Sequence, residues 1–244
     1  MGYQGVIGMD LQTMEAWLDT ITKEAALKPF YADWLNNALF ELALDFEFPT
    51  LKRLLPETVT VDDSTWVWPM PSDYHKKLFR CAFIDTDSKQ KKVTVFDRRE
   101  DLEYRDHTQT GPNVTAVAVA QQGELFNLLI DPLPTASVDL LTWYYKKPTV
   151  MTLPADYPAC MPPEYHERVL IPRVMIKNYE YLVDQVVNPN FQGLQYWQAK
   201  EERGLRGDGS HVGLIDYFNK SQGPPRRAGG RDPIGRGGWG RRGY

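Results

Sequence analysis

The sequence predicts an α+β protein: a helical bundle made from an N-terminal hairpin and C-terminal helices, with an inserted antiparallel β domain and an extended C-terminal arm. Three observations predict this. Apolar residues recur at helical spacing between residues 10 and 48, alternate in short β-rich segments between 58 and 150, and return to helical spacing after 162. Short, regularly spaced strands are typical of a sandwich or a small barrel, so the β domain is expected to be one of these.

The opening segment predicts a helical hairpin over residues 1–57. In residues 10–27, and again in the segment that follows, apolar side chains recur at i, i+3 and i+4. Asp10 is placed to cap the first helix. Trp17 and Trp34 are expected in the core of this hairpin, with a subunit interface as the alternative.

Residues 58–150 predict the β domain. The segments "KLFRCAFID", "KKVTVFD", "TAVAVA" and "VDLLTWYY" are short and rich in β-branched and aromatic residues. The polar connections "DTDSKQKK" and "AQQGEL" are typical of hairpin turns. Residues 97–113 are strongly charged, and we interpret them as an excursion between two strands.

Residues 151–204 are predicted to form helices that pack against the N-terminal hairpin. Pro163 suits the first position of a helix, whereas Pro172 falls inside the same predicted helix and is expected to kink it. A further helix ends near Gly204. Beyond it Gly and Arg dominate, so regular structure is expected to fade and residues 205–244 to form a flexible arm.

Charge is distributed unevenly between the arm and the rest of the chain. The net charge is −4, yet residues 221–244 hold six arginines against one aspartate, which leaves 22 basic against 31 acidic side chains in the first 220 residues. An acidic body disfavours nucleic-acid binding over its whole surface, whereas the basic arm suits phosphates or an acidic protein surface. The candidate contact residues of the arm are Arg226, Arg227, Arg231, Arg236, Trp239, Arg241, Arg242 and Tyr244.

No motif predicts catalysis, a cofactor or a metal site, so the protein is not expected to be an enzyme. The arm spells G-x-G-x-x-G from Gly235 to Gly240, but no strand precedes it and no helix follows. The four histidines share no metal-ligand spacing with one another or with the cysteines. His166 lies beside acids in a predicted first helical turn, where we interpret the acids as partners of the helix dipole.

The cysteines and the lengths of the apolar segments indicate the cellular compartment of the protein. Cys81 and Cys160 form no CxxC pattern and are typical of free thiols in a reduced compartment. No apolar run approaches the ~20 residues of a membrane span, and the first residues have neither the basic start nor the apolar core of a signal peptide. We therefore expect a protein of the cytoplasm, or of a particle assembled there.

One long segment, residues 128–181, carries a resemblance to a known family. It holds a strand ending in "WYYKKP", a proline-rich linker with an acid, and a helix opened by "PPEYHE". An earlier segment, "WVWPMPSDYHKK", leads into the sheet. Over about residues 10–200 the chain resembles the adaptor (head-to-tail connector) proteins of tailed bacteriophages. The residues that carry the resemblance are Pro71, Asp73, Tyr74, Tyr144, Tyr145, Pro148, Asp156, Pro162 and His166.

The resemblance implies a structural protein that forms a ring, of about twelve copies, between the portal and the tail in the neck of the virion. It implies the portal protein, tail or nozzle proteins and further copies of itself as partners, with the C-terminal arm docking on the portal. The arm lining the DNA path and a neighbouring stopper or tail-terminator ring stay open as alternatives. A nucleic-acid-binding protein that acts through its Gly/Arg-rich arm is the rival function.

Overall fold

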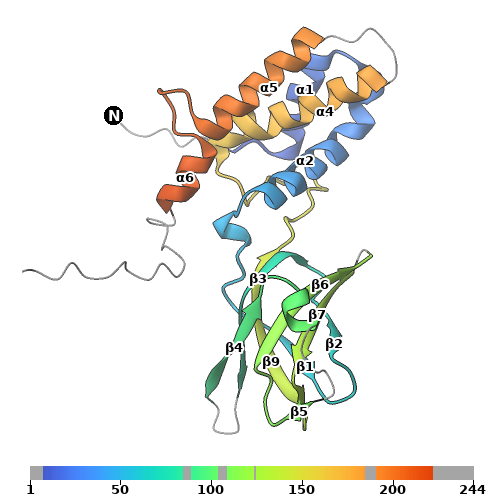
Figure 1. Ribbon diagram of the computed structural model, residues 1–244. Helices are drawn as coiled ribbons and strands as arrows, with labels where there is room; N and C mark the ends of the chain where they lie inside the picture. The colour runs from blue at the N-terminus through green and yellow to red at the C-terminus, as the bar shows by residue number, and fades with distance from the viewer. Residues whose placement is uncertain (1–7, 85–88, 104–108, 124, 185–190, 222–244) are drawn as a thin grey trace, which may run out of the picture.

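The computed structural model describes residues 8–84, 89–103, 109–123, 125–184 and 191–221. Figure 1 shows the helices, apart from the short helix Glu100–Glu103, gathered into one body and the strands into another, with the chain crossing between them twice. The first crossing follows α2 (Tyr31–Asp45) and the second follows β9 (Val138–Lys146), so the β domain is inserted between two sets of helices. The predicted α+β architecture is confirmed.

The helical body brings together helices from both ends of the chain. Asp10 caps the first helix as predicted, because its carboxylate accepts a hydrogen bond from the Thr13 N–H at 2.8 Å. Pro163 stands at the first position of a 3₁₀ turn, Pro163–Tyr165, also as predicted. The other helices are α1 (Leu11–Thr22), α4 (Ile171–Asp184), α5 (Phe191–Arg206) and α6 (Leu214–Ser221), with 3₁₀ turns at Ala25–Phe30 and Pro49–Leu51.

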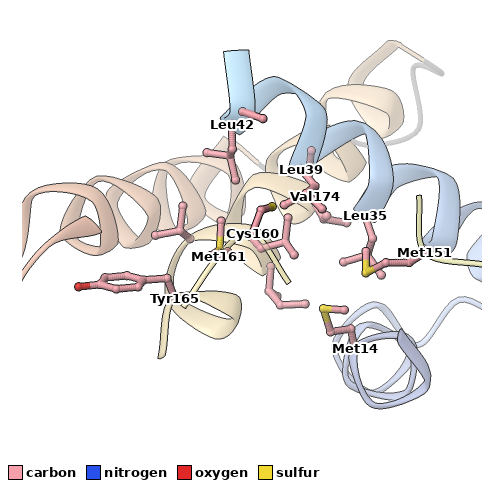
Figure 2. Close-up of a cluster of buried hydrophobic side chains, with 14 of the residues drawn as sticks. Met14, Leu35, Leu39, Leu42, Met151, Cys160, Met161, Tyr165 and Val174 are labelled. Carbon is pink, nitrogen blue, oxygen red and sulfur yellow. The ribbon is translucent and has the colours of Figure 1, made fainter. Parts of the chain in front are cut away.

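The core of the helical body includes the linker that returns from the β domain. Figure 2 shows side chains of this linker inserted among those of α1, α2 and α4. Burying a Leu or Met side chain contributes about 1.5–3 kcal/mol, so the linker is part of the fold and not a loose tether. Trp17 and Trp34 pack against the same core, as expected. The labelled core residues are Met14, Leu35, Leu39, Leu42, Met151, Cys160, Met161, Tyr165 and Val174.

The helices after the linker differ from the sequence expectation in two places. The irregularity expected at Pro172 takes the form of a π-helical turn, His166–Leu170, in which the Ile171 N–H donates to the His166 carbonyl. Pro172 has no backbone N–H, so one hydrogen bond of a regular α-helix cannot form here. The wider π-helical turn just before Pro172 fits the chain to this missing bond. Regular structure also continues past Gly204, because α5 runs to Arg206 and the amphipathic α6 packs back on the body.

The strands form a seven-stranded sheet in the order β1-β9-β3-β4-β6-β7-β2, which curls into a nearly closed barrel (Figure 1). Neighbouring strands of this sheet are antiparallel except β4 and β6, and the predicted charged excursion supplies the crossover that a parallel pair requires. Both predicted hairpins, β3–β4 and β6–β7, are present. The strands are β1 (Glu57–Val61), β2 (Val67–Pro69), β3 (Tyr74–Ile84), β4 (Gln90–Phe96), β6 (Ala116–Gln122) and β7 (Leu125–Asp131). Within or beside the excursion lie α3 (Glu100–Glu103) and β5 (Thr110–Gly111), which pairs with β8 (Leu133–Pro134).

Strand β9 shows how an alternating sequence builds this barrel. Leu140 and Tyr144 are fully buried among the residues that fill the barrel interior. Leu141 and Trp143 belong to a second cluster on the opposite face of the strand, where the Arg80 guanidinium lies 4.3 Å from the centre of the Trp143 ring. Period-two alternation thus buries both faces of β9, one inside the barrel and one under a neighbouring side chain.

Asn36 fastens the returning linker to α2. Its buried side-chain amide donates to the Met151 carbonyl at 3.0 Å, and its carbonyl accepts from the Met151 N–H at 2.8 Å. The same NH₂ group donates to the Ala32 carbonyl at 2.9 Å. Because Met151 is itself buried, these two bonds satisfy backbone groups that have no access to water.

Replacing Asn36 should therefore destabilise the protein strongly. Asn36→Ala leaves the N–H and C=O of Met151 buried without partners, and each unsatisfied group costs about 1–3 kcal/mol. The neighbouring Asn37 is exposed, so Asn37→Ala is the matched control and should change stability by less than about 0.5 kcal/mol. Urea unfolding followed by tryptophan fluorescence measures both. Equal changes in the two variants would contradict this role of Asn36.

Candidate functional site

The arm residues predicted to bind a partner lie outside the described residues. These are Arg226, Arg227, Arg231, Arg236, Trp239, Arg241, Arg242 and Tyr244. What the structure describes is the base from which the arm leaves, namely α6 and the surface beside it. That base, together with the junction between the helical body and the barrel, forms the candidate functional region.

Helix α6 is anchored in the helical body by aromatic contacts. Phe218 is 7% exposed, and its ring meets that of Phe48 edge-on with 5.0 Å between centroids. Just before α6, the Val212 carbonyl accepts a hydrogen bond from the Tyr165 hydroxyl at 3.0 Å. A Cβ on Gly213 would lie 2.4 Å from the Leu205 carbonyl oxygen, so only glycine permits this close return of the chain onto α5. The root of the arm is therefore fixed in place.

A basic pocket lies beside this root, between the π-helical turn, α5 and the turn that leads to α6. Its volume is ≈ 280 Å³, and Arg168, Lys200 and Arg203 contribute positive charge to its lining. The carboxylate of Asp208 also lines it but accepts hydrogen bonds from the N–H groups of its own turn, at 3.1 Å from Ser210. A pocket with this charge suits a carboxylate or a phosphate.

The junction brings together motif residues that are far apart in the sequence. The Tyr144 hydroxyl donates to one oxygen of Asp73 at 2.5 Å, and Arg53 pairs with the other at 3.1 Å. The Asp73 carbonyl also accepts from the Lys147 N–H at 2.7 Å. Burial, and then the hydrogen bond to Asp73, raise the pKa of Tyr144, so its hydroxyl keeps the proton that it donates. Both chain crossings are thereby tied to the start of β3.

A second polar group closes the junction on the helical side. The Tyr145 hydroxyl and the Lys77 ammonium both donate to the Glu47 carboxylate, at 2.9 Å each. Burial acts to raise the pKa of Glu47, but these two donors outweigh it and hold that pKa below its usual value. Lys76 donates to the carbonyls of Leu44 and Phe46 at 2.8 Å, and so caps the C-terminal end of α2 with a cation.

The linker acid Asp156 shapes the linker into a cap for α1. Its carboxylate accepts from the Thr152 and Leu153 N–H groups at 2.7 Å, and these bonds lower the pKa of Asp156. The turn that results presents its backbone carbonyls to the start of α1. The Asp156 carbonyl accepts from the Leu11 N–H at 2.6 Å, and the Pro154 carbonyl from Gln12. A motif residue thus satisfies helix donors that would otherwise lack partners.

His166 is a buried structural residue. The Met9 N–H donates to its Nδ1 at 3.2 Å, so Nε2 carries the ring proton and faces the Met161 carbonyl at 3.2 Å. The side chain is fully buried, and burial lowers the pKa of His166. A neutral ring with both nitrogens engaged joins the N-terminal segment to the linker. The acids beside it in sequence are not its partners at these two atoms.

Within the residues described, no three His, Cys, Asp or Glu side chains gather in a way that could hold a metal ion. No described helix is both long enough and apolar enough to span a bilayer. Cys81 and Cys160 are free thiols, both buried. Burial raises the pKa of each thiol to about 12, which makes both poor nucleophiles near neutral pH.

The described structure combines a linker that is part of the helical core, an inserted barrel and a basic pocket beside α6. Comparison with protein families is more specific. The model of the family described as SU10 adaptor protein matches residues 10–216, and the chain belongs to this family of structural bacteriophage adaptors. The resemblance seen in the sequence is confirmed. Among curated proteins no match is found.

Several residues that form the junction were not singled out by sequence motifs. Arg53 and Glu47 lie in the first crossing, whereas Asn36 lies on α2 and holds the returning linker; the partners of these three residues stand 20, 98 and 115 positions away. No spacing rule reveals such pairs in a single sequence. The prolines of the crossing segments were the available signal, because they mark where the chain leaves one domain for the other.

The buried neutral state of His166 predicts a dependence of stability on pH. A histidine whose pKa is lowered on folding stabilises fully above its unfolded pKa of 6.5, and stability falls as pH drops below that value because the unfolded chain takes up the proton first. We expect the free energy of unfolding to fall between about pH 7.5 and pH 5.5, and to fall less in His166→Gln.

The exposed His211 supplies the matched control, because His211→Gln removes a histidine from the surface and should keep the wild-type fall. Urea unfolding at the two pH values measures all three proteins. A smaller fall in His211→Gln than in His166→Gln would contradict the assignment.

Proposed function

We propose that this protein is the structural adaptor ring that joins the portal to the tail in a bacteriophage virion, and that its C-terminal arm docks on the portal. The observation that carries the proposal is the family match over residues 10–216, together with the meeting of its motif residues at the junction. The adaptor acts without catalysis. Its place is the neck between capsid and tail, and it is made in the host cytoplasm.

The described base of the arm supports portal docking. Helix α6 fixes the point from which the arm leaves, and the basic pocket extends the positive charge of the arm onto the body. In a ring of about twelve copies, +5 for each arm becomes roughly +60, so many weak contacts with an acidic portal surface combine into tight binding. The arm residues assigned to the portal are Arg226, Arg227, Arg231, Arg236, Trp239, Arg241, Arg242 and Tyr244.

A ring subunit must present two different faces to its neighbours. One candidate is an aromatic surface at the start of α2 and the end of α4. The rings of Phe30 and Trp34 stack with 6.0 Å between centroids, and Tyr181 lies 6.0 Å from Trp34. Phe30 is 44% and Tyr181 43% exposed. Exposed aromatic rings are enriched at protein interfaces, and we assign this surface to the contact between copies.

The acidic body fits a ring around a DNA path. With 31 acidic against 22 basic side chains outside the arm, it repels phosphates that pass through the ring. Tail or nozzle proteins are the partners on the far side of the ring. The rival function is nucleic-acid binding through the arm, and it depends on the same arginines as portal docking. The cosedimentation experiment below distinguishes the two functions.

Cosedimentation with purified portal rings tests the proposal. The variant that removes the arm should end at Ser221, because a chain cut earlier loses the buried Leu214 and Phe218 of α6 and damages the body itself. We expect full-length protein to bind the portal and form a ring of portal symmetry, and the shortened protein to lose this binding.

A full-length variant in which the six arm arginines become glutamine separates charge from length, and should bind weakly. Equal portal binding by all three proteins would assign the arm another role. Failure of all three to bind the portal, with salt-sensitive binding of the full-length protein to nucleic acid, would establish the rival function.

A further inference from the structure

An apolar groove lies beside the root of the arm, lined by α6, by the returning linker and by the 3₁₀ turn that begins at Pro49. Its volume is ≈ 340 Å³, within the range of about 300–1,000 Å³ typical of ligand pockets. Prolines, aromatic rings and sulfur-bearing side chains dominate its lining, and Tyr157 is 59% and Tyr217 37% exposed. The lining residues used below are Tyr157, Cys160, Met161, Pro163, Tyr217 and Phe218.

The first described residues of the chain contact the linker and the 3₁₀ turn that begins at Pro163, both of which contribute to this groove. A Cβ on Gly8 would lie 3.5 Å from Pro163, and Met9 is held by its N–H bond to His166. Two residues later, the Leu11 N–H donates to the Asp156 carbonyl, next to Tyr157 in the sequence. The described chain therefore begins beside Pro163, which lines the groove, and passes the residue next to Tyr157, which also lines it.

We propose that the N-terminal segment of the same chain, residues 1–7, occupies this groove. The segment, "MGYQGVI", has no charged side chain and carries apolar groups at Met1, Tyr3, Val6 and Ile7. Seven extended residues reach about 23–25 Å, so the segment can cross the groove from its fixed end at Gly8. Burial of these apolar side chains against the apolar lining of the groove removes them from water, which is favourable.

The C-terminal arm is the competing occupant, because it begins at residue 222, four positions after Phe218. Its composition argues against it. Residues 222–244 hold six arginines, and an arginine loses hydration in an apolar groove that offers no carboxylate among its lining residues. The basic arm is thus suited to a charged surface and the apolar N-terminal segment to an apolar one. The apolar groove therefore fits the N-terminal segment better than the arm.

Photocrosslinking tests the proposal on the full-length protein and requires no portal. A benzophenone amino acid in place of Tyr3 preserves an aromatic side chain, and peptide mapping by mass spectrometry locates its adducts. We expect adducts within residues 157–163 and 217–218 of the same chain. The charge variant Ile7→Asp should lower their yield at least about tenfold, because a charge replaces a buried apolar group. Gln4→Asp places the same charge on the segment without removing an apolar group, and should retain more of the yield.

Three results would overturn the proposal. Adducts of the Tyr3 probe outside the groove show that the segment lies elsewhere. Adducts in the groove from a probe at Trp239, and none from the Tyr3 probe, assign the groove to the arm. In a mixture of isotopically light and heavy protein, adducts that join light to heavy chains assign the occupant to a second copy. Each of these outcomes leaves the proposed portal docking to its own test.

Discussion

The carboxylate of Asp73 is the interaction on which the arrangement of the two domains depends. It accepts from Tyr144 on the returning strand and pairs with Arg53 on the outgoing crossing, while its own carbonyl accepts from the Lys147 N–H. Two crossings that meet at one residue leave the barrel little freedom to swing relative to the helices. The hydrogen bond from Tyr144, a fully buried residue, contributes about 1.5–3 kcal/mol. The ion pair with Arg53 is partly exposed, so solvent screening limits its contribution to about 1 kcal/mol or less.

This fixed connection between the two domains supports the adaptor proposal on physical grounds. A subunit between two partners must hold the surfaces that face them in a constant relation. Here the root of the arm is packed on the helical body through Phe218, and the barrel is held to the same body through Asp73 and Glu47. The linker between them is part of the core through Met151. Each domain is therefore anchored to shared elements and not only tethered by the chain.

The fold could be predicted from the sequence because its signals are local. Helical spacing, the Asp10 cap and the alternation along β9 each depend on neighbours within one element. The parallel pairing of β4 with β6, and the packing of α6 past Gly204, depend on contacts with distant segments and were not predicted. In the candidate site, too, some residues could be identified from the sequence, whereas their contacts could not. The family motif singled out Asp73 and Tyr144, but that they touch, and that Arg53 completes the group, required the structure.

The contacts of Asp73 predict that the helical body and the barrel behave as one rigid unit. Spin labels on cysteines placed at two exposed positions, Tyr196 on α5 and Leu125 on β7, measure the distance between the domains by pulsed electron spin resonance. Both native cysteines are buried, so the labels go to the introduced ones. We expect a single narrow distance distribution, which Asp73→Ala broadens. A broad distribution with Asp73 intact, or one that Asp73→Ala leaves unchanged, would contradict it.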